Sequence, residues 1–399
     1  MMLQGIRVLD LSQFIFVPYC CVHLADLGAE VIKIENPNTG GDPNRGMMGG
    51  HLPDAGFNYG FEQNNRSKKS IAVDLSHQEE KEVIHKLVAV SDVFVTNFQV
   101  LTLKRLGMDY ESLTRFNPAL IYALGTGYGL NGPDKDRGAF DYGVFARSGM
   151  MSTFGEPDSP LCQCQPGMGD HAAAMSLAFG IMAALFHRQR TGEGQLVETS
   201  LLGGLLDIGG LSLQAALATG EDIPRRDRKS TGNPLCNSYA TKDGEWLQLA
   251  SKQSDRNWPD FCRALGIEHL QNDPRFEDHV KRSENAAELI AILDKIFAGA
   301  TLDEWAQRFE GLNVHWSPVY TYSQVAADPQ AWENGYIVET EHPQLGSLKV
   351  VGLPVAFSKT PPLVRSGAPE LGQHTEQIML DIGYSWDDIT RLKDQNVII

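Results

Sequence analysis

The sequence has no surplus of positive charge. Its 399 residues include 34 Lys and Arg against 50 Asp and Glu, a formal net charge of −16. A general nucleic-acid binder neutralises phosphates with a basic surplus, so this composition excludes that class and we expect no nucleic-acid partner. Any anionic ligand must be held by a local basic pocket.

The sequence also lacks the residue patterns that are typical of disulfide frameworks, metal sites and secreted proteins. The six cysteines form no C-x-x-C pair, and His171, His187 and His374 have no zinc-ligand spacing, so we expect no metal. The start of the chain, MMLQGIRVLD, does not resemble a signal peptide, which favours a cytoplasmic location. The longest apolar run, residues 172–186, is shorter than the ~20 residues that cross a bilayer. We therefore interpret it as a buried core helix and expect no membrane partner.

Hydrophobic residues make up 42% of the chain, enough for a sizeable core. Strand-like segments alternate with helical ones along the first half of the sequence. The strand candidates are 6–11, 31–35, 70–75, 92–97 and 120–124, and the helical stretches between them include 21–27, 77–90 and 109–115. This alternation predicts an α/β fold with a mostly parallel sheet flanked by helices.

The composition of the sequence changes at two places along the chain. The polar segment GEDIPRRDRKSTGNP begins near residue 220, and a hairpin is expected around Asp243-Gly244, followed by helices at 258–265, 286–297 and 302–309. The chain turns again near Pro318, before further strands and a helix near 375–382. We therefore predict a large domain from 1–219, a smaller α+β domain from 220–318, and a segment 319–399 that returns to the large domain.

The most informative local feature is Gly167-Met-Gly-Asp170, directly before an apolar helix predicted over 172–190. Glycines allow a ligand to come close, and Asp170 is expected at or near the helix N-cap, where backbone N–H groups favour the ionised carboxylate. The residues alone leave two roles open, a helix cap and a reactive group.

Other motifs are weaker. The segment Gly125-Thr-Gly-Tyr-Gly is not followed by a helix, so it fails the test for a dinucleotide site and is better interpreted as a glycine-rich wall beside a ligand. Ser200 lacks the G-x-S-x-G context of a hydrolase. Basic residues occur in three clusters: Arg66, Lys68 and Lys69; Lys104 and Arg105; Lys135 and Arg137. Each cluster could either contact phosphates or form a solvated face.

Several separated motifs, taken together, resemble the class III CoA-transferases of the CaiB/BaiF type. They are GIRVLDLS (5–12), LADLGAEVIKIE (24–35), NRSKKSIAVDL (65–75), Asn97-Phe98, Arg105-Leu-Gly, Gly169-Asp170, TGEGQ (191–195) and LGQHT (371–375). The resemblance covers nearly the whole chain. The family includes formyl-CoA, carnitine and 2-hydroxyacyl CoA-transferases, with the related α-methylacyl-CoA racemases.

This resemblance implies a large Rossmann-like domain formed by the N- and C-terminal segments, a smaller inserted domain, and two subunits threaded through one another as an interlocked homodimer. It implies that Asp170 attacks an acyl-CoA donor and that anhydride and aspartyl-CoA intermediates carry CoA to a carboxylic acid acceptor. CoA is then a substrate, with no tightly bound cofactor. Amides around Gly167 and Gly169, or from the smaller domain, would stabilise the oxyanions.

The resemblance also assigns CoA contacts position by position, to Ile15, Phe16, Val73, Asp74, Leu75, Asn97, Phe98, Gln99 and Arg105. Two positions depart from formyl-CoA transferase, which has basic residues where this chain has Asn36 and Ala139. Lys135 or Arg137 are candidates to replace them. The multi-glycine loop of formyl-CoA transferase is not visible in the smaller domain, which argues against formate or oxalate as substrate.

Two alternatives remain open. A racemase of the same fold needs a histidine in the Gly-His-Asp segment, where this chain has Phe140 before Asp141, and phenylalanine cannot carry a proton. A non-catalytic CoA-binding module would keep Arg105 but would not need Asp170. The aromatic residues Phe14, Phe16, Tyr19, Phe140, Tyr142 and Phe145 favour a bulky acid, although the same residues would also suit a core.

Overall fold

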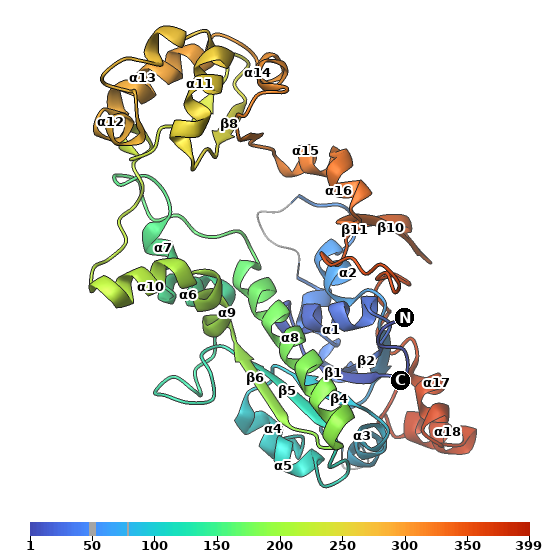
Figure 1. The fold of residues 1–399 in the computed structure, drawn as a ribbon. Helices are drawn as coiled ribbons and strands as arrows, with labels where there is room; N and C mark the ends of the chain where they lie inside the picture. Colours follow the sequence, from blue (N-terminus) through green and yellow to red (C-terminus); the bar gives the residue numbers. More distant parts are fainter. Residues whose placement is uncertain (48–52, 78–79) are drawn as a thin grey trace. The chain divides into compact units, whose positions relative to one another are not determined.

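The computed structural model describes residues 1–47, 53–77 and 80–399, which form two compact units. The first unit contains Met1–Met151, Gln163–Asp222 and Pro329–Ile399. The second contains Ser152–Cys162 and Ile223–Asp328. The short segment 152–162 is thus grouped with the second unit although it lies within the sequence of the first. Figure 1 shows the helices and strands of both units.

The first unit is organised around a six-stranded parallel sheet in the order β3-β2-β1-β4-β5-β6. Its strands are β1 (Arg7–Leu11), β2 (Glu30–Glu35), β3 (Lys69–Ala72), β4 (Val93–Thr96), β5 (Ile121–Thr126) and β6 (Leu196–Ser200). The predicted α/β fold with a parallel sheet is confirmed. Sequence analysis missed β6, whose residues are mostly exposed or half-buried and therefore lack the apolar run of a central strand.

Helices cover both faces of this sheet (Figure 1). On one face, α1 (Phe16–Asp26) packs against α8 (Met168–Thr191). The core on the other face is shared by α3 (Glu80–Ala89), α4 (Val100–Leu106), α5 (Tyr110–Leu113), α17 (Thr375–Asp381) and α18 (Trp386–Asp394). The C-terminal helices therefore complete the same core as the N-terminal strands. Within the helix predicted over 77–90, residues 78–79 lie outside the described residues, and His77 lies in a bend and not in the helix.

The strand order reverses between β1 and β4, which are neighbours in the sheet with Leu11 opposite Thr96. In open α/β sheets, ligands bind in the crevice beyond the carboxyl ends of the strands at such a reversal. The segments that leave these two strands, 12–15 and 97–99, are therefore the expected walls of a site.

The first unit also contains elements outside the central sheet and its covering helices. It comprises η1 (Pro37–Thr39), η2 (Pro43–Arg45), α2 (Tyr59–Asn65), α6 (Asp141–Arg147), α9 (Leu201–Ile208), α10 (Gly210–Thr219), α16 (Pro329–Glu333) and the antiparallel pair β10 (Ile337–His342) and β11 (Gly346–Val351). Helix α7 (Met150–Thr153) lies where the two units meet in sequence.

The second unit has its own antiparallel sheet, β7 (Ser238–Ala240), β8 (Trp246–Leu249) and β9 (Trp316–Pro318). The predicted hairpin around Asp243-Gly244 joins β7 to β8. Its helices are α11 (Ser254–Leu265), η4 (Glu268–Leu270), α12 (His279–Glu284), α13 (Ala286–Phe297), α14 (Leu302–Phe309) and α15 (Tyr322–Ala327), and η3 (Arg228–Ser230) precedes β7. An aromatic core including Trp258, Phe297 and Trp305 holds these elements together.

Helix α8 was expected to be a buried core helix, and only one of its faces is buried. Ala173, Leu177 and Ile181 are fully buried, whereas Phe179 is 77% exposed and Phe186 is 62% exposed. By length and composition alone, α8 is the one helix in the described part of the chain that could cross a membrane, and the bent pair α9–α10 passes the same test as a pair. A single helix of this kind is weak evidence for a membrane span, because the core helix of a protein that spans no membrane passes the same test.

Candidate active site

Helix α8 begins on a residue that cannot cap it. Gly167 occupies the N-cap in a left-handed conformation (φ +79°) and supplies no side-chain hydrogen bond. The cap comes instead from Asp141, the first residue of α6. Its Oδ2 accepts the Gly167 N–H at 2.9 Å and its Oδ1 accepts the Gly169 N–H at 2.8 Å. A carboxylate from a neighbouring helix therefore satisfies the free N–H groups of the first turn of α8.

Asp170 is the third residue of α8 and lies near the N-cap, as predicted, but the expectation that it stays ionised at neutral pH does not agree with its surroundings. Burial, and then the negative charge of Asp141, raise the pKa of Asp170 to about 7. Within the described part of the chain, its carboxylate has no hydrogen-bond partner. The carboxylate is thus half-buried, unpaired and close to equal protonation and ionisation at neutral pH.

Gly169 allows this arrangement because it has no side chain. A Cβ at this position would lie 2.4 Å from Asp141 Oδ1 and 3.0 Å from Leu205 Cδ1. The amides of Gly167 and Gly169 donate to Asp141 in this structure, so neither is free to donate to an oxyanion here, and the alternative source in the smaller domain stays a prediction. Neither α6 nor a role for Asp141 was predicted; an acidic residue at the start of a helix is the signal for capping that could have been used.

Asp170 lines a cavity of about 720 Å³ within the first unit, a volume typical of ligand sites. Large apolar and aromatic side chains form much of its wall, and Asn97, Phe98 and Gln99 come from the loop after β4. The predicted glycine-rich wall is present at Gly125 and Gly127. The wall also includes Phe14, Ile15, Phe16, Met47, Tyr59, Leu101, Lys135, Arg137, Ala139, Phe140, Asp141 and Tyr142.

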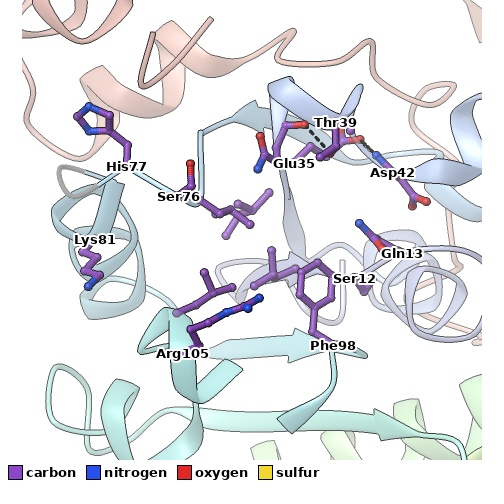
Figure 2. A pocket seen from close by; sticks show the side chains of 16 residues that line it. Ser12, Gln13, Glu35, Thr39, Asp42, Ser76, His77, Lys81, Phe98 and Arg105 are labelled. Atoms are coloured by element: carbon purple, nitrogen blue, oxygen red, sulfur yellow. Dashed lines mark hydrogen bonds between the residues drawn. The ribbon is translucent and has the colours of Figure 1, made fainter. Parts of the chain in front are cut away.

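A second cavity of about 470 Å³ lies at the carboxyl ends of β1, β2 and β3. Figure 2 shows His77 and Lys81 on one side of it, Arg105 and Phe98 on another, and Gln13 near Asp42 on a third. Three basic side chains therefore line this cavity. Phe98 lines both cavities, so the two share a wall at the strand reversal.

The turn from β1 to α1 lies between the cavities and is held by polar contacts. Asn97 Oδ1 accepts the Gln13 N–H at 3.0 Å, and Asn97 Nδ2 donates to the Gln13 carbonyl at 2.7 Å. The Phe14 N–H donates to Asp42 Oδ1 at 3.0 Å, which supports Phe14 in an unusual left-handed conformation (φ +67°). Asn97 thus links the ends of β1 and β4.

Buried ion pairs beneath this turn were not anticipated. Lys68 Nζ lies 2.8 Å from Asp10 Oδ2, and Lys33 Nζ lies 2.9 Å from Asp42 Oδ2, with all four side chains fully buried. The charge of Lys68 contributes to holding the pKa of Asp10 below its ordinary value, despite the opposing effect of burial. Charged residues within otherwise apolar strands, such as Asp10 and Lys33, were the available signal.

The cluster Arg66, Lys68 and Lys69 is neither a phosphate site nor a solvated face. Arg66 is buried and pairs with Asp26 at 2.8 Å, Lys68 pairs with Asp10, and the half-buried Lys69 lies 2.7 Å from Glu30. These cations are neutralised within the fold because burying an unpaired charge is costly.

The residues assigned to CoA divide between the two cavities. Ile15, Phe16, Asn97 and Gln99 line the cavity that contains Asp170, and Leu75 and Arg105 line the other. Val73 and Asp74 line neither: Val73 is fully buried, and the Asp74 N–H donates to the carbonyl of Val397. Asn36 lines the cavity that contains Arg105, and Ala139 lines the one that contains Lys135 and Arg137.

Phe140 occupies the position at which the resemblance to CoA-transferases and racemases implies the histidine of a racemase. Its side chain is 70% exposed, lines the cavity, and packs edge-to-face against Phe14 with ring centroids 5.6 Å apart. Among the described residues that line this cavity there is no histidine. His171 follows Asp170, but its ring stacks on Tyr19 at 4.2 Å.

Comparisons with known proteins agree with the sequence motifs and the strand order. A model of the family described as CoA-transferase family III matches residues 3–375. The chain is 33% identical to (R)-2-hydroxy-4-methylpentanoate CoA-transferase of Clostridioides difficile, across 100% of both proteins. It is 32% identical to cinnamoyl-CoA:phenyllactate CoA-transferase of Clostridium sporogenes, across 100% of this chain and 98% of that protein. A CaiB/BaiF family protein from Brucella suis superimposes with a TM-score of 0.85 at 29% identity, covering 95% of this chain and 99% of that one.

Proposed function

The chain belongs to CoA-transferase family III, and from that premise we propose that it transfers CoA from an acyl-CoA thioester to a free carboxylic acid through covalent intermediates on Asp170. Enzymes of this family use CoA thioesters and carboxylates as substrates, so CoA enters and leaves as part of the reaction. The question for this chain is which residues hold the substrates and carry the acyl group.

In the first half of the reaction, a carboxylate oxygen of Asp170 attacks the thioester carbonyl of the donor. The C–S bond breaks, CoA leaves as the thiolate, and an acyl-aspartyl anhydride remains. The thiolate then attacks the aspartyl carbonyl of the anhydride. The bond between the aspartyl carbonyl carbon and the bridging oxygen breaks, so the bridging oxygen leaves with the donor acyl group as a carboxylate and an aspartyl-CoA thioester remains.

The second half repeats these steps with the acceptor. Its carboxylate attacks the aspartyl thioester, which releases CoA thiolate and forms a second anhydride. The thiolate attacks the acceptor carbonyl of this anhydride, so the product is the acceptor's CoA thioester and the ionised Asp170 is restored. Activation is kept in thioester or anhydride form throughout, provided that water is excluded from the site.

The observation that carries this proposal is the environment of Asp170. Its carboxylate is unpaired within the described residues, lines the larger cavity, and has a pKa raised to about 7. Structural carboxylates are ordinarily paired, and a strongly perturbed one in a cleft is a candidate for chemistry. A carboxylate of higher basicity is also a better nucleophile, and about half of it is ionised at pH 7.

We assign the anionic end of CoA to the smaller cavity, because its wall contains Arg105, Lys81 and His77. Arg105 is suited to phosphate because a guanidinium offers a fork of donors. The pantetheine arm would pass Phe98 and Gln99 into the cavity that contains Asp170. Lys135 and Arg137 supply further cations there, which favours them as replacements for the basic residue absent at Ala139, whereas Asn36 lines the smaller cavity.

The structure gives less support to the alternatives. A racemase needs an acid/base partner opposite Asp170, and the corresponding residue here is Phe140, which cannot exchange protons. A non-catalytic CoA-binding protein has no use for an unpaired carboxylate in the cavity, since such a group destabilises the fold. We therefore favour the transferase.

The side chains of the cavity wall favour an acceptor acid that carries a bulky apolar group. Phe14, Phe140, Tyr142, Met47 and Leu101 lie on the same wall as Asp170. The relatives from Clostridioides difficile and Clostridium sporogenes are named for branched and aromatic acids, which agrees with this wall. We expect branched or aromatic acids to be better acceptors than oxalate, and steady-state rates with a panel of acids test this expectation.

We also propose that the protein is a cytoplasmic homodimer with interlocked subunits. An apolar surface on α8 and α10 supports a second copy: Phe179 is 77% exposed, Leu211 is 88% exposed and Leu217 is 71% exposed. All six cysteines are free, which suits a reducing compartment. Light scattering after gel filtration distinguishes monomer from dimer.

Trapping of the covalent intermediate tests the function. The purified protein is mixed with acyl-CoA, quenched with hydroxylamine or borohydride, digested, and analysed by mass spectrometry. We expect an adduct on the peptide that contains Asp170, and none in the Asp170→Asn variant. Transfer without any adduct at Asp170, or full turnover by Asp170→Asn, would overturn the proposal.

A further inference from the structure

The carboxylate of Asp141 shares the first turn of α8 with Asp170. Both residues line the same cavity, and Asp141 is only 8% exposed. We propose that Asp141 is a positioning residue that fixes the turn carrying Asp170 and sets the pH above which Asp170 can attack. This inference rests on the proposed function of Asp170.

The positioning part follows from the hydrogen bonds. Each oxygen of Asp141 accepts one backbone N–H, from Gly167 and Gly169, so the peptide units that precede these two glycines are held. The next residue is Asp170. Since Gly167 has no side chain of its own with which to cap the helix, loss of Asp141 would leave this turn without a side-chain cap.

The space around Gly169 shows that the contact is close-packed. Asp141 Oδ1 would be 2.4 Å from any Cβ at residue 169, and Leu205 of α9 closes the other side. Helices α6, α8 and α9 pack against one another at this point. The direction of the Asp170 side chain is thus fixed by a contact between three helices and not by α8 alone.

The electrostatic part follows from the shared cavity. Two carboxylates in one partly buried site disfavour ionisation of each other, so the charge of Asp141 makes Asp170 harder to ionise. The backbone N–H groups of the α8 turn favour the charged form of Asp141, although burial raises its pKa overall. Because the N–H groups of Gly167 and Gly169 donate to the carboxylate of Asp141, we place the negative charge on Asp141 and the titration on Asp170.

Other titratable groups around Asp170 come from each element packed on α8. The Cys164 thiol, 4.0 Å from Asp141 Oδ2, has its pKa raised to about 11. His171 is next in the helix and has a lowered pKa through burial. The remaining groups are Asp136, Lys135 and Arg137 on the cavity wall, Tyr59 of α2, Tyr142 of α6, Tyr19 and His23 of α1, Glu198 of β6 and Asp207 of α9. Burial and Asp141 are the influences on the pKa of Asp170.

The test measures single-turnover formation of the Asp170 adduct between pH 5 and pH 9, with acyl-CoA and no acceptor. In the wild-type protein, we expect the rate to rise with pH around a midpoint near 7. Asp141→Asn removes the charge and one of the two acceptors. We expect its midpoint to fall by about 1 pH unit or more, and its plateau rate to fall at least ~10-fold.

Two further variants separate charge from position. Asp141→Glu keeps the charge on a longer arm, so we expect a midpoint near that of the wild type with a lower plateau. Glu193→Gln removes one exposed carboxylate just after the far end of α8, roughly 35 Å away by helix rise, and should change neither. The 3′-phosphate of CoA titrates near pH ~6 in every variant, so only differences between variants are compared.

The inference would be overturned if Asp141→Asn folds and the pH midpoint of its adduct formation is the same as in the wild type or higher. A lower plateau rate would not rescue it, because a merely structural role of Asp141 predicts a lower rate with an unchanged midpoint. If Asp141→Asn does not fold, NMR titration of ¹³C-labelled aspartates in the wild type and in Asp170→Asn decides. Coupling is reciprocal, so the Asp141 carboxyl must titrate at lower pH when residue 170 is neutral. Absence of any adduct on wild-type Asp170 would instead refute the proposed function.

Discussion

The ionised carboxylate of Asp170 should destabilise the folded protein, and replacing it with the isosteric amide should therefore stabilise the fold. The pKa of Asp170 is raised from 3.8 to about 7. At ~1.36 kcal/mol for each pKa unit, this difference corresponds to about 4 kcal/mol as an upper bound. Because solvent reaches the half-buried side chain, we expect about 2–4 kcal/mol in practice.

The sign of the pH dependence follows from proton binding. Between pH ~4 and pH ~7, the folded protein holds a proton on Asp170 that the unfolded chain has released, so its stability falls as the pH rises through this window. Asp170→Asn carries no charge at any pH. Its advantage over the wild type should therefore grow by about 2 kcal/mol or more between pH 5 and pH 8.

Urea unfolding of the ligand-free proteins at several pH values measures this difference. Glu193→Gln is the matched control, since it removes the same charge from an exposed position and should show no such pH-dependent gain. Bound CoA must be removed first, because a ligand that binds only the folded state adds stability of its own. The reasoning would be refuted if Asp170→Asn were no more stable than the wild type at pH 8.

Three further predictions use matched pairs of residues. Gly169→Ala places a Cβ 2.4 Å from Asp141 Oδ1 and should lower kcat ~100-fold, whereas Gly143→Ala, which meets no atom within 4 Å, should stay within about twofold of wild type in the same assay. Arg105→Ala should raise the KM for acyl-CoA at least ~10-fold with little change in kcat, and Lys104→Ala, which removes the same charge from the same helix outside the cavity wall, should not. Lys68→Met removes the ion-pair partner of the buried Asp10 and should cost about 3–5 kcal/mol in urea unfolding, against less than ~1 kcal/mol for Lys69→Met. Equal effects within any pair would contradict the corresponding placement.

The strands of the first unit were predictable because their sequences are short apolar runs. Five of the six parallel strands were identified from such runs, whereas β6 escaped because its residues are mostly exposed or half-buried. The motifs around Asp10, Lys33 and Asp170 were enough to identify the family. Motif order along a chain is a property of the sequence, so it needed no structure.

The roles of individual charges were not predictable in the same way. Arg66 and Lys68 form part of a basic cluster in the sequence, yet both are buried opposite Asp26 and Asp10. These partners lie 40 and 58 residues away along the chain. Pairing between such distant residues depends on strand order, which the motifs did not give.

The sequence by itself determined the α/β class, the parallel strands and the membership of a CoA-transferase family, because these depend on local periodicity and on motifs that are contiguous in the chain. Only the tertiary structure decided the state of Asp170. Its helix is capped by Asp141, 29 residues earlier, through the N–H groups of Gly167 and Gly169. The ease with which the Asp170 carboxylate ionises depends on its burial and on the negative charge of Asp141 from another helix. It does not depend chiefly on the position of Asp170 near a helix N-terminus.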